Sequence, residues 1–82
     1  MGVVFMPFDA KVMGLVIRKL RKRRKITQEV FSGFAAISRS HLAALERGHT
    51  AKVETYDKIA SALDMPLSEL FRLVEEEMNK EA

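Results

Sequence analysis

The sequence predicts an all-α fold, a compact bundle of five short helices. Apolar residues recur at the three- and four-residue spacing of amphipathic helices, and strict alternation over strand lengths does not occur. The chain has 82 residues, of which 48% are hydrophobic. A domain of that size supports one small core but leaves little apolar material for a deep substrate pocket. Because the sequence has no cysteine, disulfides and thiolate chemistry are excluded.

The first helix is expected from about Ala10 to Arg24, after an apolar N-terminal arm formed by residues 1–9. Asp9 precedes the helix as its N-cap, since its carboxylate accepts hydrogen bonds from free amides of the first turn. In the arm, Pro7 favours an extended backbone at the preceding residue. The apolar positions of the helix follow the i, i+3, i+4, i+7 spacing, and they are Met13, Val16, Ile17 and Leu20.

The second and third helices are short, and each follows a hydroxyl residue that suits an N-cap. Thr27 is expected to cap a helix that begins at Gln28, and Ser38 to cap a helix that ends at Arg47. Gly48 then supplies a left-handed residue that stops the third helix. The inward apolar positions are Phe31 and Ala35 in the second helix and Leu42 and Leu45 in the third.

The fourth helix is expected to open at Glu54 or Thr55 and to end before Pro66, and the fifth begins after that proline. Residues 10–74 thus form one predicted domain. Residues 75–82 are acidic and uncapped, so we expect a frayed C-terminal tail. The inward positions are Tyr56, Ile59, Ala60 and Leu63 in the fourth helix and Leu67, Leu70, Phe71 and Val74 in the fifth.

The formal net charge of +3 hides a strong asymmetry along the chain. Eleven basic residues stand against two acidic ones between residues 11 and 52, a local charge of +9, while the rest of the chain contributes −6. Such a division is typical of proteins that bind polyanions. For the densest part of the basic segment, residues 18–25, the alternative is an ordinary solvated helix surface.

Five strings carry a resemblance to a known family. They are Thr27-Gln28-Glu29, Ala35-Ala36-Ile37-Ser38-Arg39-Ser40, Leu45-Glu46-Arg47-Gly48, Lys58-Ile59-Ala60-Ser61-Ala62-Leu63 and Leu67-Ser68-Glu69-Leu70-Phe71. In order and spacing, they resemble the phage repressor/Cro-like (XRE-type) helix-turn-helix family over roughly residues 14–71. The resemblance implies a lambda-repressor-like domain whose second and third helices form the DNA-binding unit.

The resemblance places base contacts at the exposed start of the third helix, at Arg39, Ser40, His41 and Ala44. Arg39 suits guanine, whose O6 and N7 accept a bidentate guanidinium, whereas Ala44 offers only a methyl contact to thymine. The family often has a longer polar side chain at Ala44. Together with the local charge, the resemblance predicts phosphate contacts by Gln28, Thr27, Arg23, Arg24, Lys25, Ser38, Arg47, His49 and Lys52.

Two further pairs have structural interpretations. Arg21 and Glu46 match an ion pair that family members bury between the first helix and the end of the third; the alternative is that Arg21 is one more solvated basic residue. Leu73 and Met78 lie off the inward face of the fifth helix, where family dimers commonly meet. The alternative for them is scattered apolar surface.

Three positions depart from the family pattern. Ala36 replaces the glycine that is usual in the turn, which implies a strained left-handed alanine or another turn shape. Val30 and Phe34 form an outward apolar stripe where polar residues are common. We expect the arm, with Val3, Val4, Phe5, Met6 and Phe8, to fold over this stripe as an enlarged core; binding of a protein partner through the stripe or the arm is the alternative.

The sequence therefore predicts a cytoplasmic homodimer that binds double-stranded DNA and has no contact with a membrane. The resemblance implies a repressor or autoregulator that recognises a palindromic operator through its third helix. The alternative is an antitoxin-type or other protein-interaction module whose DNA binding is autoregulatory. An enzyme is not expected, because no nucleophile, base and orienting group come together in the sequence, and no cofactor or metal site is predicted.

Overall fold

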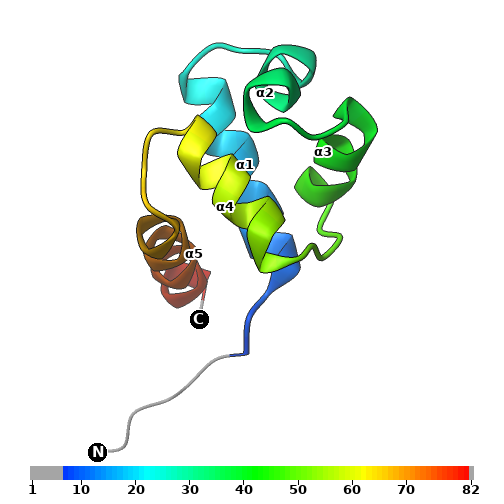
Figure 1. The fold of residues 1–82 in the computed structure, drawn as a ribbon. Helices are drawn as coiled ribbons and strands as arrows, with labels where there is room; N and C mark the ends of the chain where they lie inside the picture. Colours follow the sequence, from blue (N-terminus) through cyan, green and yellow to red (C-terminus); the bar gives the residue numbers. More distant parts are fainter. Residues whose placement is uncertain (1–6, 82) are drawn as a thin grey trace, which may run out of the picture.

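The computed structural model describes residues 7–81, which form five helices and no strand. Figure 1 shows them in order: α1 (Ala10–Arg23), α2 (Gln28–Ala35), α3 (Arg39–Glu46), α4 (Val53–Ala62) and α5 (Leu67–Glu81). The prediction of an all-α bundle of five helices is therefore confirmed. None of these helices is both long and apolar enough to cross a membrane.

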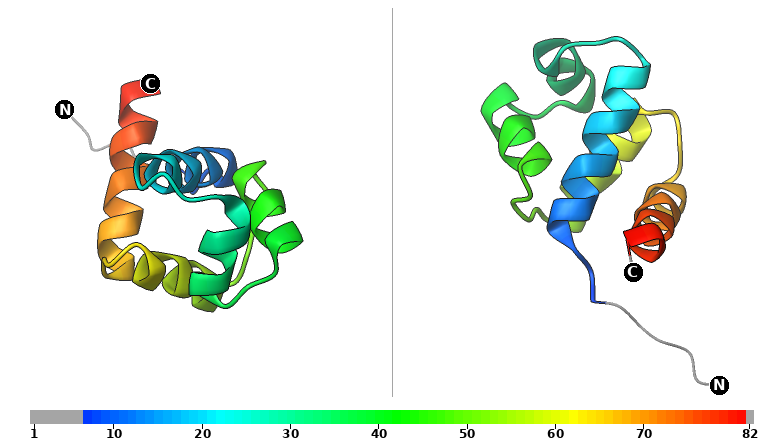
Figure 2. Two further views of the ribbon diagram at one scale, coloured as in Figure 1. Left: turned by 90° about the horizontal axis from the view of Figure 1, so that it is seen from above. Right: turned by 180° about the vertical axis from the view of Figure 1, so that it is seen from behind.

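The helices form a ring around one core. α1 and α4 lie on opposite sides of the ring, with α2 and α3 on one flank and α5 on the other, as the view from above in Figure 2 shows. α1 packs against α3 and α5, while α4 packs against α2 and α5. The largest fully buried side chains are Phe31, Met13, Ile17, Leu42, Leu45, Ile59, Leu63, Leu70 and Val74, all at positions that the helical periodicity assigns to the core.

Side-chain caps fix the first three helix starts at the predicted residues. The Asp9 carboxylate accepts from the amide of Lys11 at 2.9 Å and from that of Val12 at 3.3 Å. The start of α4 differs from the prediction: this helix begins at Val53, one residue before Glu54, and its first turn has no side-chain cap. Its N-terminus was harder to predict because no capping hydroxyl or carboxylate marks it.

The C-terminal tail also differs from the prediction, because α5 continues through residues 75–81. Met78 follows Val74 by four residues and therefore lies on the same face of the helix. Its side chain is only 8% exposed and joins the core. Burial of this side chain extends the helix beyond the point where propensity and capping alone would end it.

Two glycines are required by the backbone. At Gly14, an added Cβ would overlap the carbonyl oxygen of Leu45, because α1 and α3 approach each other closely there. Gly48 has φ 103°, a left-handed conformation that ends α3 as predicted. The close packing at Gly14 was not predicted, although a glycine inside an amphipathic helix is itself a signal of it.

Phe8, at the described end of the N-terminal arm, packs at a different place from the one expected. The ring of Phe8 lies 5.9 Å from that of Tyr56 and 6.0 Å from that of Phe71, measured between centroids, so it packs on α4 and α5. On α2, Val30 remains 46% exposed and Phe34 67% exposed. Phe8 therefore does not cover the apolar stripe. The expectation for Val3, Val4, Phe5 and Met6 lies outside the described residues.

Candidate nucleic-acid interface

α2 and α3 form a helix-turn-helix in which a side-chain cap begins each helix. The hydroxyl of Thr27 accepts from the amide of Val30 at 3.2 Å, and that of Ser38 accepts from the amide of His41 at 3.0 Å. Between the helices, Ala36 has φ 56° and ψ 42°, a left-handed conformation. The turn therefore keeps the shape that a glycine would favour, with alanine in its place.

The first turn of α3 projects polar side chains away from the core. Arg39, Ser40 and His41 are exposed, whereas Leu42 is fully buried. Ala44, one turn further along, is half-buried. Of the four residues expected at base edges, three are thus exposed, with the Ser40 hydroxyl 3.4 Å from that of Ser38, and the fourth presents only a small methyl group.

A buried network holds the two ends of this unit against α1. Arg21 donates from Nε to Glu46 Oε2 at 2.7 Å and from Nη2 to Glu46 Oε1 at 2.9 Å, so the ion pair expected from the sequence is present. Arg21 Nη1 also donates to the carbonyl of Ile26 at 2.9 Å. Gln28, the first residue of α2, donates from Nε2 to Glu46 Oε1 at 3.0 Å. The Glu46 carboxylate, at the end of α3, thereby links the last turn of α1 to the first residue of α2.

Electrostatics follows from this geometry. The side chains of Arg21 and Glu46 are 9% and 3% exposed. Burial alone would raise the pKa of Glu46, but the hydrogen bonds from Arg21 and Gln28 and the nearby positive charges outweigh it, and the pKa is lowered. The hydrogen bond to Glu46 raises the pKa of Arg21. Both groups are therefore held in their charged forms.

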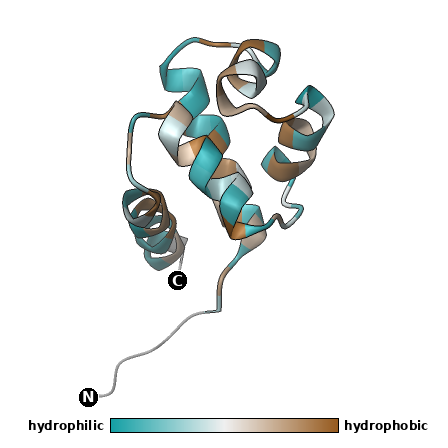
Figure 3. Cartoon of the chain, viewed as in Figure 1, coloured by the Kyte–Doolittle hydropathy of each residue, from teal (hydrophilic) through white to brown (hydrophobic). Residues whose placement is uncertain are grey.

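Most of the expected phosphate contacts lie at exposed positions around the helix-turn-helix. Lys25, Thr27, Ser38, Arg47, His49 and Lys52 are exposed, while Gln28 is half-buried by its bond to Glu46. Figure 3 shows that the hydrophilic end of α1 leads directly to the start of α2. The end of α1 therefore brings part of its basic surface next to the helix-turn-helix.

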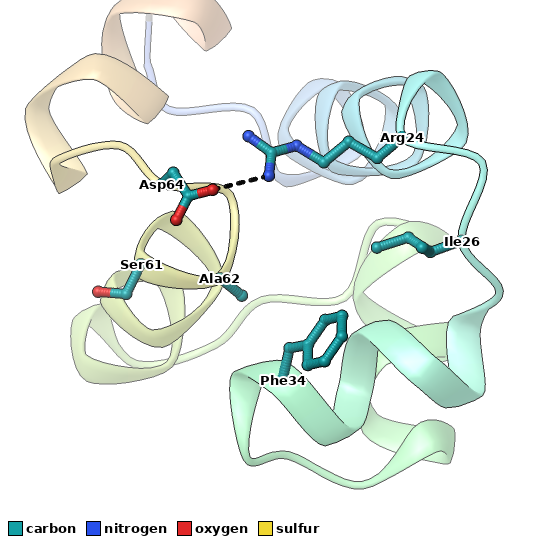
Figure 4. Close-up of a pocket in the computed structure, with 6 residues that line it drawn as sticks. All are labelled: Arg24, Ile26, Phe34, Ser61, Ala62 and Asp64. Atoms are coloured by element: carbon teal, nitrogen blue, oxygen red, sulfur yellow. Dashed lines mark hydrogen bonds and ion pairs between the residues drawn. The ribbon is translucent and has the colours of Figure 1, made fainter.

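Two of the expected phosphate contacts are placed elsewhere. Arg24 donates to the Asp64 carboxylate at 3.0 Å and to the carbonyl of Leu63, at the end of α4, as Figure 4 shows for Asp64. Arg23 lines a groove between α1 and α5. The sequence could not reveal these positions, because the groove at Arg23 and the partners of Arg24 involve segments far apart in the chain.

The two expected dimer contacts differ in exposure. Leu73 is half-buried and lines the groove between α1 and α5, so part of its surface remains free. Met78 belongs to the core of its own chain. The expectation that Met78 lies off the inward face of α5 is therefore wrong, and little of its side chain is left for a partner.

Comparison with known proteins assigns the fold to a family. The helix-turn-helix model HTH_3 matches residues 17–70, and no curated protein matches the chain. The restriction-modification controller protein C.AhdI from Aeromonas hydrophila is 29% identical, with a TM-score of 0.71 over 74% of this chain and 94% of the other. The controller protein C.Esp1396I is 21% identical, with a TM-score of 0.80 over 92% and 99%.

A third solved structure, the clp gene regulator ClgR from C. glutamicum, is 20% identical with a TM-score of 0.77 over 89% of this chain and 96% of the other. At this identity, it and C.Esp1396I establish the fold alone. The family model carries more weight, since it spans well over half of the chain and includes the whole of α2, α3 and α4. The protein therefore belongs to the helix-turn-helix family HTH_3 and is a DNA-binding transcriptional regulator.

Proposed function

We propose that the protein binds a palindromic operator as a homodimer, places α3 in the major groove, and acts as a repressor or autoregulator. The observation that carries the proposal is the exposure of Arg39, Ser40 and His41 on the first turn of a helix whose other end is locked by Glu46. A rigid helix with free donors at its start suits base recognition in a groove.

Arg39 is the main specificity residue in this proposal. Its side chain is exposed and pairs with no carboxylate of the described residues, so its guanidinium is available for the O6 and N7 of a guanine. Such a bidentate contact favours guanine over the other bases by roughly 1–3 kcal/mol of binding free energy. Ser40 and His41 supply further donors, and Ala44 a methyl contact.

Phosphate contacts fix the orientation of the unit on the duplex without specifying sequence. The proposed contacts are Lys25, Thr27, Gln28, Ser38, Arg47, His49 and Lys52. Thr27 and Ser38 use their hydroxyls as helix caps, so their free backbone amides are the groups proposed to donate.

A dimer is proposed because one small module buries only about 600–1,000 Å² on DNA, and a two-fold operator needs two modules. Leu73 in the groove between α1 and α5 is the proposed contact. The solved relatives support a regulatory role: two are controllers of restriction-modification systems, and C.Esp1396I has been solved in a nucleoprotein complex.

A protein-interaction module of the antitoxin type is the second candidate. The observation that favours it is the apolar stripe of Val30 and Phe34, which stays exposed beside a groove of about 440 Å³ that Ile26 and Ala62 also line. Figure 4 shows the ring of Phe34 at the edge of this groove. Co-purification of a stable partner that is lost on Phe34→Ser would favour this function.

Selection from randomised duplex DNA tests the main proposal. We expect a palindromic consensus with half-sites about one helical turn apart and a guanine opposite Arg39. Arg39→Ala should relax the preference at that base pair only. Recovery of no consensus, or of a single half-site, would contradict the proposed dimeric recognition.

A further inference from the structure

We propose that a cleft between α1, α2 and α3 holds a backbone phosphate of the bound DNA, with Arg18 as a contact beyond those that the family resemblance predicts. The inference rests on the proposed function and adds a residue to it. The cleft has a volume of about 300 Å³ and is lined by Arg18, Arg21, Gln28, Ala43, Glu46 and Arg47.

The charges in this cleft favour an anion. The single carboxylate, Glu46, is already bound by two N–H groups of Arg21 and by Gln28. Arg18 and Arg47 are exposed at the same cleft and form no ion pair with any carboxylate among the described residues. Two positive charges therefore remain uncompensated around one opening, which matches a monoanionic phosphate.

Gln28 is held in a suitable orientation at the base of the cleft. A carboxylate only accepts hydrogen bonds, so the amide nitrogen of Gln28 must face Glu46. That nitrogen carries two hydrogens, and the bond to Glu46 uses one. The second N–H is free to donate to a phosphate oxygen, and the network with Arg21 holds it in place before DNA arrives.

The positions along α1 explain why Arg18 faces a different surface from its basic neighbours Lys19 and Arg23. Arg18 and Arg21 are three residues apart and share the face toward α2 and α3. Lys19 and Arg23 are four residues apart and line the groove toward α5, where Lys19 pairs with Glu77 at 3.2 Å. The basic segment is thus divided between two faces, and only one of them meets the helix-turn-helix.

The test compares Arg18→Gln with Lys19→Gln, which removes the same charge from the adjacent residue on the other face. Binding of each variant to the selected operator is measured by fluorescence anisotropy at several salt concentrations. Each phosphate contact contributes about 0.9 to the slope of log K against log salt, so Arg18→Gln in a dimer should reduce the slope by roughly 1.8. Lys19→Gln should leave the slope at the wild-type value.

Gln28→Ala supplies a second measurement, because a neutral donor releases no counterion. It should weaken binding without changing the salt slope. Thermal unfolding of each variant shows whether it is folded. An unchanged slope for Arg18→Gln, or an equal reduction for Lys19→Gln, would overturn the inference while leaving the operator assignment intact. If the wild-type protein itself selects no operator, the proposed function fails first.

Discussion

Ala36 has a left-handed backbone in the turn between α2 and α3, with φ 56° and ψ 42°. For a residue with a Cβ this conformation costs about 1–2 kcal/mol, and glycine avoids most of that cost. Glycine also loses more backbone entropy on folding, which offsets part of the gain. We expect Ala36→Gly to stabilise the protein by roughly 0.5–1 kcal/mol, measured as a higher urea midpoint. A lower midpoint would show that the strain is absent. A Cβ added at Gly33 would meet open space, so Gly33→Ala is the matched substitution in the opposite direction, from glycine to alanine.

For the ion pair of Arg21 and Glu46 we expect substitutions to lower the stability of the protein. Removal of one member leaves a buried, uncompensated charge, so Arg21→Ala should cost about 3–5 kcal/mol of unfolding free energy. The double variant Arg21→Met, Glu46→Leu should recover most of the loss, because both charges are then gone. Equal losses in the single and double variants would contradict this account.

The lowered pKa of Glu46 also predicts how stability depends on pH. Its contribution is fully present above the pKa of an unfolded glutamate, about 4.3, and is lost as the pH falls through the lower pKa of the folded protein. Urea unfolding from about pH 7 down to about pH 3 should therefore show a steeper loss of stability in the wild type than in the double variant. Parallel curves for the two proteins would contradict the role of Glu46.

At the scale of the helices, the sequence predicted what short-range signals determine. Asp9, Thr27 and Ser38 mark three helix starts with side-chain caps, and the apolar spacing identified the core positions. Apart from the uncapped start of α4, the errors fall where a distant segment decides the outcome. α5 continues past residue 74 because Met78 is buried, and Arg24 turns toward Asp64, 40 residues away. For Ala36 the family pattern left a left-handed alanine and another turn shape open, and the structure has the left-handed one. Gly14 and the cleft at Arg18 required the packing of α1 against α3.

The last turns of α5 give a prediction for that element. Met78 is 8% exposed and packs with the core, so Met78→Ala should destabilise the protein by about 2 kcal/mol or more. Asn79→Ala is the control, since that exposed neighbour has no part in the core and alanine favours the helix. Chemical denaturation distinguishes the two. Equal, small effects would indicate that the end of α5 contributes little to folding.

On the scale of the whole molecule, the net charge of +3 is less informative than its division. The segment from residue 11 to residue 52 includes α1, α2 and α3 and carries +9, whereas α4 and α5 lie in the acidic remainder. Since α5 packs on the opposite side of α1 from α3, the acidic helix stands away from the proposed DNA contacts. Lys19 and Arg24 pair with Glu77 and Asp64 of the acidic remainder, while the basic residues around α2 and α3 lie away from α5.

This separation predicts that local contacts, and not net charge, determine the salt dependence of DNA binding. A dimer that neutralises about 6–10 phosphates should lose roughly 10³–10⁵ in affinity between about 50 and about 200 mM salt. Lys52→Gln removes a proposed contact and should lower the salt slope by roughly 1.8 in the dimer. Glu75→Gln changes the net charge by the same amount in the opposite direction, at an exposed position of α5. Glu75 lies away from the proposed DNA contacts, so the salt slope of this variant should equal that of the wild type. If the two substitutions changed the slope by equal and opposite amounts, total charge would govern binding and the proposed orientation on DNA would be wrong.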